Sequence, residues 1–336
     1  MEKIEQLQSY LQKKQFSQLF LLVDDNTSVN CMPILLEKID EITDRQAVLL
    51  EIPHGEENKT LSTAENIIRS LAQSEADRDS CLLSLGGGVV TDLGGFVSSV
   101  FKRGIENINI PTTLVGMADA AIGGKTAVNI DGIKNLIGTF NFGVLKNDSV
   151  LSYDVFKNKV FLDTDFLSTL SVNQIKDGVA EILKTFLVAD EGLSRKFLDS
   201  PIEKNAVVPY IEPCATIKER IVSQDPYDRG IRKSLNFGHT LGHAVEMFYN
   251  LSHGHSVAVG IHYALDLSVK HCNFPYEKAK AILQFIEINY ELPPYDKDIS
   301  QLTDLMRQDK KNTDEKINFI LLEDIAKPCL VSVYQV

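Results

Sequence analysis

The residues best suited to chemistry in this chain are histidines crowded into one short stretch. Four of the seven histidines lie in the sequence NFGHTLGHAVEMFYNLSHGH (236–255). His239 and His243 are four residues apart, so a helix would place both on one face, and His253 or His255 could add a third nitrogen. Imidazole binds zinc and similar ions, and a catalytic ion usually has three protein ligands. The stretch indicates a metal site, against the alternative of histidines that are only packed and hydrogen-bonded.

An anionic ligand for such an ion must come from elsewhere in the chain. The segment GVAEILK (178–184) carries Glu181 in an otherwise apolar helical stretch, with Lys184 one turn later. A glutamate and a lysine at this spacing are often a surface pair. In an apolar neighbourhood, a metal-binding carboxylate and an anion-binding lysine are the competing interpretation.

Two glycine-rich segments indicate binding of anionic groups. LSLGGGVVTDLGGF (83–96) has three glycines between an expected strand and an expected helix, a place where backbone and helix terminus favour phosphate. It lacks the spacing of the common dinucleotide fingerprint, and Asp92 could simply cap the helix. The second segment, residues 111–138, combines glycines with lysines and asparagines typical of an anion-binding wall, although a surface loop is the alternative.

The elements that must position these residues differ between the two halves of the chain. Apolar runs at 19–25, 47–53, 81–88 and 107–113 predict buried strands, and 62–76 predicts a helix between them. Such alternation is typical of a parallel sheet covered on both faces, an α/β domain.

The second half has mostly helical spacing, as in 172–188 and 256–272, and ends in one or two expected strands after a turn at 312–315. We therefore expect a Rossmann-like α/β domain over residues 1–160 and a mainly α-helical domain over 161–336.

Composition narrows the class of protein. The chain has 336 residues, 44% hydrophobic and 24% charged, which is ordinary for a globular protein of two domains. A net charge of −12 argues against nucleic-acid binding. We expect no membrane span and no signal peptide, because no apolar run is long enough and the N-terminus is polar. Five scattered cysteines without a CxxC pair predict reduced thiols in the cytoplasm.

Several motifs in one order resemble the 3-dehydroquinate synthase family. They are GGGVVTDLGGF (86–96), KRG (102–104), PTTLVGMADAAIGGKTAVN (111–129), KNLIG (134–138), GVAEILK, LNFGHTLGHAVE (235–246) and SHGH (252–255). The resemblance covers most of the chain, from about Asp24 to the DKK at 309–311. It implies an N-terminal NAD-binding α/β domain, a C-terminal helical metal-binding domain and a homodimer.

The same resemblance implies specific roles for residues. It implies that Zn²⁺ or Co²⁺ is bound by Glu181, His239 and His253, and that His243 is a proton-transfer group instead of a ligand. It implies NAD contacts at Asp24, Glu56, Lys59, Gly88, Val89, Val90, Thr91, Asp92, Thr112, Thr113, Lys125, Lys134, Phe166, Leu167, Ser168 and Thr169. It implies substrate contacts at Asp119, Lys125, Asn135, Lys184, Lys218, Arg232, Asn236 and Lys310, with Arg103 reaching the substrate of the neighbouring subunit.

The implied substrate is a phosphorylated sugar acid, 3-deoxy-D-arabino-heptulosonate 7-phosphate. Transient oxidation by NAD⁺ acidifies a neighbouring C–H, phosphate leaves by β-elimination, hydride returns, and an aldol step closes the ring to 3-dehydroquinate. Basic side chains would hold the phosphate and carboxylate by position and charge.

Three positions depart from the usual family pattern. His54 stands where an aspartate is usual, Thr91 stands where a glycine is usual, and His255 replaces a glutamate beside an expected metal ligand. The stretch 142–158 is also longer than the usual connection.

Three other functions are the alternatives to this interpretation. They are a related sugar-phosphate cyclase that makes a valiolone or a deoxy-inosose, an NAD- and metal-dependent polyol dehydrogenase, and an inactive binding protein. Arg232, Leu235, Asn236 and His243 favour the dehydroquinate type over other cyclases, and the many basic residues argue against a simple dehydrogenase.

Overall fold

The computed structural model describes residues 2–131, 133–141, 143–147, 150–154, 158–307 and 316–333. The chain folds as two compact units, Met1–Ser171 and Val172–Val336. Each unit has its own buried core.

The first unit is built on a parallel sheet of six strands in the order β1-β10-β5-β4-β2-β3. Its strands are β1 (Glu2–Lys3), β2 (Leu19–Asp24), β3 (Val48–Ile52), β4 (Cys81–Gly86), β5 (Glu106–Pro111) and β10 (Asn158–Leu162). The four apolar runs predicted as strands are β2 to β5, so the parallel α/β interpretation is confirmed. Continuous burial along β2 and β4 explains why these two runs lack polar alternation.

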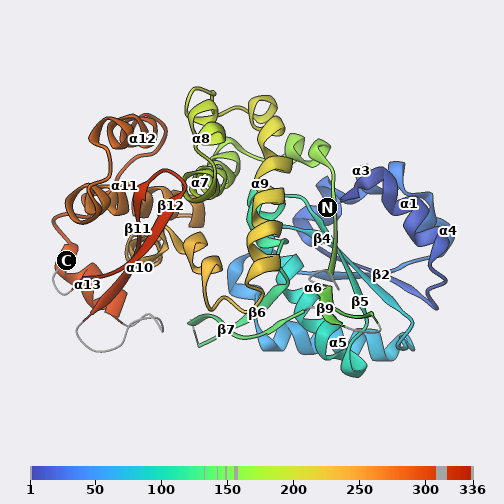
Figure 1. Ribbon diagram of the computed structural model, residues 1–336. Coiled ribbons are helices and arrows are strands. Elements are labelled where there is room, and N and C mark those ends of the chain that lie inside the picture. The colour runs from blue at the N-terminus through green and yellow to red at the C-terminus, as the bar shows by residue number, and fades with distance from the viewer. Residues whose placement is uncertain are drawn as a thin grey trace. The chain divides into compact units, whose positions relative to one another are not determined.

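Helices cover both faces of this sheet. They are α1 (Ile4–Lys13), α2 (Asp25–Asn30), α3 (Met32–Lys38), α4 (Asp40–Asp44), α5 (Leu61–Gln73) and α6 (Gly88–Val100). In Figure 1, α1, α3 and α4 lie above the sheet and α5 and α6 lie below it. The lower layer is one apolar cluster in which Phe20 and Leu22 of β2 pack with Leu71 of α5 and Leu93 of α6. Burial of these side chains packs α6, which begins at the glycine-rich turn, against the sheet.

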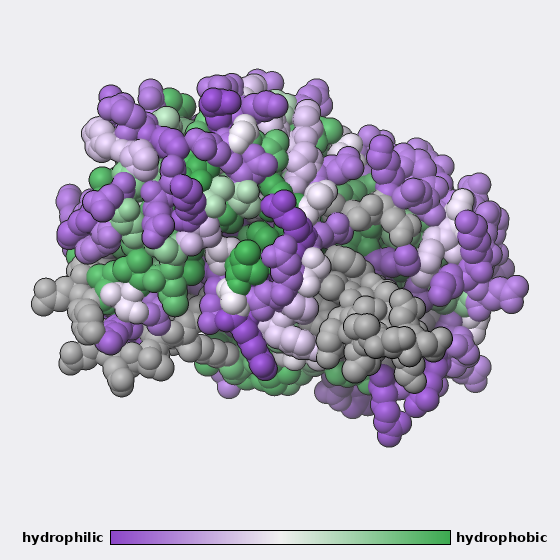
Figure 2. All heavy atoms as spheres, viewed as in Figure 1, coloured by the Kyte–Doolittle hydropathy of each residue, from purple (hydrophilic) through white to green (hydrophobic). Residues whose placement is uncertain are grey.

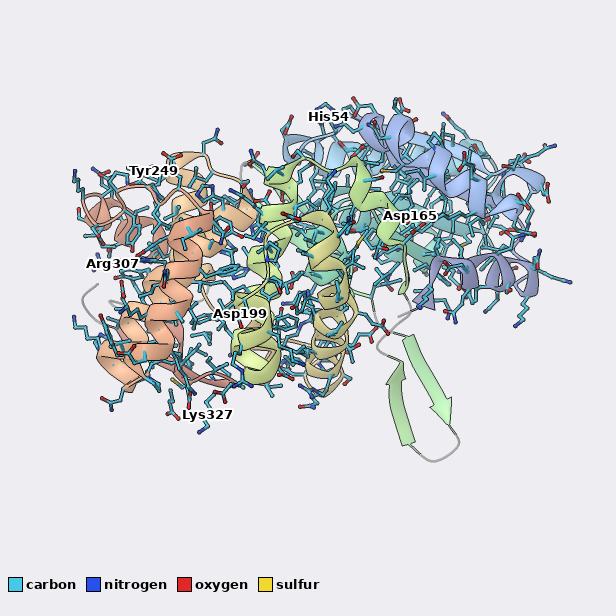
Figure 3. All side chains as sticks on the ribbon, turned by 90° about the horizontal axis from the view of Figure 1, so that it is seen from above. His54, Asp165, Asp199, Tyr249, Arg307 and Lys327 are labelled. Atoms are coloured by element: carbon cyan, nitrogen blue, oxygen red, sulfur yellow. The ribbon has the colours of Figure 1, made fainter. Side chains whose placement is uncertain are left out.

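Short helical turns and two hairpins complete the first unit. The turns are η1 (Glu56–Asn58), η2 (Phe101–Arg103), η3 (Gly116–Ala120) and η4 (Thr164–Thr169). One antiparallel hairpin pairs β6 (Lys125–Ile130) with β7 (Ile133–Phe140). The other pairs β8 (Gly143–Asn147) with β9 (Val150–Asp154) inside the long connection noted in the sequence, and Figure 3 shows it as a separate two-stranded ribbon.

The second unit is mainly helical, as the sequence predicted. Its helices are α7 (Val172–Ala189), α8 (Glu191–Leu198), α9 (Lys204–Gln224), η5 (Ile231–Asn236), α10 (His239–Tyr249), α11 (His253–Cys272), α12 (Tyr276–Asn289) and α13 (Ile299–Arg307). The expected C-terminal strands are β11 (Ile317–Asp324) and β12 (Lys327–Val333), an antiparallel hairpin whose turn is marked by Lys327 in Figure 3. The turn expected at 312–315 lies outside the described residues.

Hydrophilic residues predominate on the face seen in Figure 2, with smaller hydrophobic areas between them. None of the described helices combines the length and the apolar character that crossing a membrane requires.

Candidate active site

Three potential metal ligands converge in the second unit, each from a different helix. Glu181 lies in the middle of α7, and His239 and His253 are the first residues of α10 and α11. One ligand atom from each lies within 4.8 Å of the others. His253 Nε2 is 2.9 Å from Glu181 Oε1, and His239 Nε2 is 3.7 Å from the same oxygen. Two imidazole nitrogens and one carboxylate are the donor set expected of a catalytic zinc or cobalt site with an open position.

Both histidines are oriented by a contact at their other ring nitrogen. His253 Nδ1 lies 3.1 Å from Glu246 Oε2, and His239 Nδ1 lies 3.1 Å from the carbonyl oxygen of Phe237. In the neutral form of each ring, an Nδ1–H that donates to these oxygens leaves the Nε2 lone pair free to bind an ion. Histidines that bind zinc in proteins commonly have their second ring nitrogen held by a carboxylate or carbonyl oxygen in this way.

Glycines bring the helices of this cluster together. Gly238 has a φ of +77° directly before His239, a conformation that favours glycine. A Cβ at Gly254 would lie 2.2 Å from Cα of Asp177, so α11 can approach α7 this closely only with glycine there. The glycines that mark this stretch in the sequence therefore set where His239 and His253 lie.

Asp177 of α7 holds the first turn of α11. Its Oδ1 accepts hydrogen bonds from Ser252 Oγ at 2.5 Å and from the His255 amide at 3.1 Å, while burial raises the pKa of the Asp177 carboxyl. The ring of His255 points to another partner, with Nε2 2.6 Å from the carbonyl oxygen of Glu291 and an edge contact to Tyr290. His255 thus serves the packing of α11, and Glu246 supplies the carboxylate beside His253.

Buried charge surrounds the cluster. Glu181 is fully buried, and its Oε2 lies 2.6 Å from Nζ of Lys184, which is 2% exposed. Burial and the positive charge of Lys184 hold the pKa of His239 well below its usual range. Burial also lowers the pKa of His253, but hydrogen bonds to Glu181 and Glu246 outweigh it and raise that pKa to about 10.

His243 lies beside the three ligands without joining them. Its ring centre is 5.3 Å from that of His239 and 6.4 Å from that of His253. The i, i+4 spacing correctly places His239 and His243 on one side of α10, but the ligand atoms that meet belong to His239, His253 and Glu181 among the described residues.

Two predicted substrate residues are buried cations on neighbouring elements. Lys218 of α9 is 6% exposed and Arg232 of η5 is 3% exposed, and both elements pack against α7. Arg232 donates from Nη1 to the carbonyl oxygen of Pro226 at 2.7 Å. The Asp225 carboxylate accepts three backbone N–H groups, those of Arg229, Gly230 and Arg232, and so fixes the loop that carries Arg232. Asn236, at the end of η5, is half-buried.

In the first unit the glycine-rich turn joins β4 to α6. Gly86 cannot accept a side chain, because a Cβ there would lie 2.5 Å from Val90. Thr91 is buried, and its Oγ1 donates to the carbonyl oxygens of Gly87 and Gly88, each at 3.2 Å. The hydroxyl that replaces the usual glycine therefore binds back to the turn itself.

Several predicted cofactor residues meet around this turn. The Thr112 amide donates to the carbonyl oxygen of Gly86 at 3.0 Å, and a Cβ at Gly87 would lie 3.0 Å from Thr113. Lys59 is buried, forms an ion pair with Asp92 and donates to Asn135 Oδ1 at 2.7 Å. Asn135, predicted to bind substrate, thus shares a contact with Lys59, which was predicted to bind NAD.

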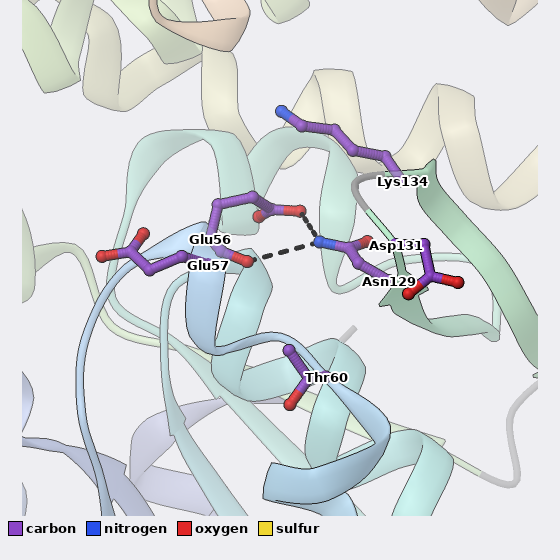
Figure 4. A pocket seen from close by; sticks show the side chains of 6 residues that line it. All are labelled: Glu56, Glu57, Thr60, Asn129, Asp131 and Lys134. Atoms are coloured by element: carbon purple, nitrogen blue, oxygen red, sulfur yellow. Dashed lines mark hydrogen bonds between the residues drawn. The ribbon is translucent and has the colours of Figure 1, made fainter.

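A pocket of about 380 Å³ opens beside these residues (Figure 4). Asn129 Nδ2 donates to Glu56 at its wall, at 2.9 Å to Oε1 and 3.3 Å to the carbonyl oxygen. The lining residues are Glu56, Glu57, Thr60, Asn129, Asp131 and Lys134, two of which were predicted to contact NAD.

Asp24 and the segment 166–169, both predicted to contact NAD, make contacts with other residues of the first unit. The Asp24 carboxylate caps α2, accepting from the Thr27 amide at 2.7 Å and the Thr27 hydroxyl at 2.9 Å. Thr169 Oγ1 lies 3.7 Å from Cys31 Sγ, which brings the end of η4 close to the α2–α3 junction. His54 Nδ1 lies 2.8 Å from Asp25 Oδ1, so the residue that replaces the usual aspartate is paired with an acid.

The remaining predicted residues lie on several elements, of which η3 and β6 both pack against α6. Asp119 lies in η3, exposed Lys125 begins β6, and exposed Arg103 has a φ of +70° at the end of η2. Val89 and Val90 lie in the first turn of α6. Lys310 lies outside the described residues.

Sequence reasoning missed three supporting acids: Glu246, Asp177 and Asp225. Glu246 stands in the same motif as the histidines, so an acid within a histidine cluster was a usable signal. The other two act through backbone amides brought near only by the fold, and neither has a local signature.

Known protein families match both halves of the chain. The family described as 3-dehydroquinate synthase N-terminal matches residues 49–177, and 3-dehydroquinate synthase C-terminal matches residues 178–312. A 3-dehydroquinate synthase of Parabacteroides distasonis is 38% identical, with 95% of this chain and 88% of that protein covered. One from Campylobacter jejuni is 35% identical, with 93% and 87% covered.

A solved structure of 2-deoxy-scyllo-inosose synthase, complexed with carbaglucose-6-phosphate, NAD⁺ and Co²⁺, has a TM-score of 0.83. It is 25% identical to this chain and covers 98% of it, with 91% of that structure matched. Both family descriptions and the relatives that are more than 30% identical point the same way: the chain belongs to the 3-dehydroquinate synthase family.

Proposed function

We propose that this protein is an NAD- and metal-dependent 3-dehydroquinate synthase, a lyase that converts 3-deoxy-D-arabino-heptulosonate 7-phosphate into 3-dehydroquinate and phosphate. The observation that carries the proposal is the convergence of Glu181, His239 and His253, with Lys184 in contact with Glu181. Membership in the family supports the reaction, and the complex of the related inosose synthase supports NAD⁺ and Co²⁺ as cofactors.

The donor set fits a divalent ion. Two Nε2 atoms and one carboxylate oxygen face one another, and both Nδ1 atoms are held by oxygens. Glu181, His239 and His253 would hold Zn²⁺ or Co²⁺. When bound, the ion would polarise adjacent substrate hydroxyls and NAD⁺ would supply a hydride acceptor that is regenerated in each turnover.

The chain's own residues would bind and orient the substrate. Lys184, Lys218, Arg232 and Asn236 would hold its anionic and hydroxyl groups, because buried cations are strong binders of phosphate and carboxylate. His243 lies beside the metal ligands without being one of them, which suits a group that moves a proton at the substrate. Asp119, Lys125, Asn135, Lys310 and, from a second copy, Arg103 complete the proposed substrate set.

We propose that the two units bind different groups. The domain predicted to end at residue 160 would bind NAD through the turn at Gly88, Thr91 and Asp92 and through the residues around Lys59 and Lys134. The helical unit would bind the metal and much of the substrate. We propose a homodimer in the cytoplasm, the compartment that five scattered cysteines without a CxxC pair predict.

Turnover of the heptulosonate phosphate tests the function directly. With NAD⁺ and Zn²⁺ or Co²⁺, we expect phosphate and dehydroquinate in equal amounts and no lasting absorbance from NADH. Steady accumulation of NADH would instead indicate a dehydrogenase. Phosphate release that does not depend on added NAD⁺, from protein stripped of cofactor, would also contradict the proposal.

Glu246 should matter for metal affinity through its contact with His253. Replacing Glu246 with alanine removes the partner of Nδ1, and we expect metal affinity to fall about 10- to 100-fold. Equilibrium dialysis with Co²⁺ measures the change. Glu287→Ala is the matched control, because Glu287 contacts the ring of His262, which lies outside the ligand set, at 3.3 Å. Equal affinities in the two variants would refute the orienting role of Glu246.

Metal binding should also depend on pH through His253. Its raised pKa keeps this ring protonated at neutral pH without metal, whereas a ligand must be neutral, so binding must displace a proton. His239, with its lowered pKa, releases none. The apparent affinity for the metal should therefore rise by about tenfold per pH unit, as long as binding displaces one proton from His253. Calorimetry in two buffers at about pH 6, below the usual pKa of zinc-bound water, measures this proton, and a buffer-independent heat would contradict it.

A further inference from the structure

Two cysteines at the far end of α11 form a close pair of thiols. Cys272 is the last residue of α11 and Cys329 lies in β12, 57 positions later in the sequence. Their sulfur atoms are 3.6 Å apart, and both residues are half-buried. Cys31, Cys81 and Cys214 are buried instead, so the pair differs from them in both proximity and access.

Regular structure fixes this proximity. Cys329 is the cross-strand partner of Leu321 in the β11–β12 hairpin. The hairpin is bound to α11 because the Leu322 amide donates to Ser268 Oγ at 3.0 Å. Ser268 and Cys272 are four residues apart, so they share the face of α11 that meets the hairpin. The two thiols therefore stay close without any flexible segment having to move.

We propose that Cys272 and Cys329 form a reversible intramolecular disulfide when the protein meets a hydroperoxide. In the first step the Cys272 thiolate attacks one peroxide oxygen, and sulfenic acid and hydroxide result. In the second step Cys329 sulfur attacks the Cys272 sulfur, the S–O bond breaks, and water leaves. The sum is two thiols and one hydrogen peroxide giving one disulfide and two waters. The sulfurs need to approach by only about 1.6 Å to reach bonding distance, which side-chain rotation can supply.

The surroundings favour Cys272 as the sulfur that is oxidised first. Burial and the neighbouring Cys272 raise the pKa of the Cys329 thiol to about 12, and Cys329 Sγ also donates to the carbonyl oxygen of Leu321 at 3.6 Å. The thiolate is the reactive form, so Cys329 is slow toward peroxide and Cys272 is left as the sulfur that is oxidised first. Cys329 is placed to resolve the sulfenic acid by its position 3.6 Å away.

The cross-link should act on stability and leave the proposed metal site in place. Cys272 and His253 are the two ends of a 20-residue helix, so they are separated by about 28 Å at 1.5 Å per residue. A disulfide between Cys272 and Cys329 closes a loop of 57 positions, and such a cross-link stabilises a protein mainly by restricting the unfolded chain. The hairpin is also bound to α10 by Thr240 Oγ1, which donates to Asn318 O at 3.1 Å, so the cross-link reinforces a contact already present.

Peptide mapping and thermal unfolding of the full chain test the proposal. After treatment with hydrogen peroxide we expect a linked peptide containing Cys272 and Cys329, and a melting temperature higher by on the order of 10 °C than in dithiothreitol. Dithiothreitol should reverse both effects, and metal content should not change. None of these readouts depends on the proposed enzymatic activity.

Single substitutions provide the controls. Cys272→Ser and Cys329→Ser should each abolish the linked peptide and the shift between oxidised and reduced protein, whereas Cys214→Ala should keep both. Because the shift is measured within each variant, a change in baseline stability does not affect the comparison. Absence of the linked peptide in the unmodified protein, or an undiminished shift in Cys272→Ser, would overturn the proposal.

Discussion

Replacing His253 with alanine is expected to remove the metal ion, whereas replacing His243 with alanine is expected to leave it bound. His253 Nε2 is one of the three converging ligand atoms, and its loss leaves two ligands and exposes the carboxylate of Glu181. Because loss of a supporting contact alone costs about 10- to 100-fold in metal affinity, loss of a ligand should cost more than about 100-fold. Turnover should fall with the metal.

His243→Ala should show the opposite pattern. The three ligand atoms remain, so metal content should stay near one ion per chain, while the rate falls by about 10²- to 10⁴-fold through loss of proton transfer. Elemental analysis of both purified variants separates the two roles before any rate is measured. His271→Ala, exposed at the other end of α11, is the matched control and should change neither quantity. Equal metal loss in the His243 and His253 variants would refute the division of roles.

The parts of the fold that the sequence predicted are those with local signals. The apolar run 81–88 contains the buried strand Cys81–Gly86, because every residue of that strand meets a helix layer or a neighbouring strand. The long helical stretches 172–188 and 256–272 have enough turns for their period to be unmistakable, and both are helices.

The candidate site was harder to predict from the sequence, because the positions of metal ligands relative to one another depend on the tertiary structure. Spacing alone pairs His239 with His243, yet the atoms that meet are on three helices, brought together by close approaches such as that of Gly254 to Asp177. Only the family resemblance separated His243 from the ligands. The contact of Glu246 with His253 depends on the turn between α10 and α11, which no periodicity describes.

Replacing Lys184 with methionine is expected to destabilise the metal-free protein strongly. Lys184 and Glu181 are 2% and 0% exposed, and their charged atoms are 2.6 Å apart. Methionine keeps much of the volume but leaves the Glu181 charge without this partner, and breaking a buried pair costs about 3–5 kcal/mol. In a unit of this size the melting temperature should fall by on the order of 10 °C. Thermal unfolding in the presence of a chelator measures it.

The metal should reverse part of this loss. Without Lys184 the Glu181 carboxylate is freed from a competing cation, so Zn²⁺ should bind Lys184→Met at least as tightly as the unmodified protein and stabilise its folded state. Lys196→Met, an exposed lysine on α8, is the matched control and should change stability by no more than about 0.5 kcal/mol. A Lys184→Met variant as stable as this control would show that the buried pair contributes little. Tight metal binding combined with lost turnover would instead assign Lys184 to substrate binding, since the ligands themselves would be intact.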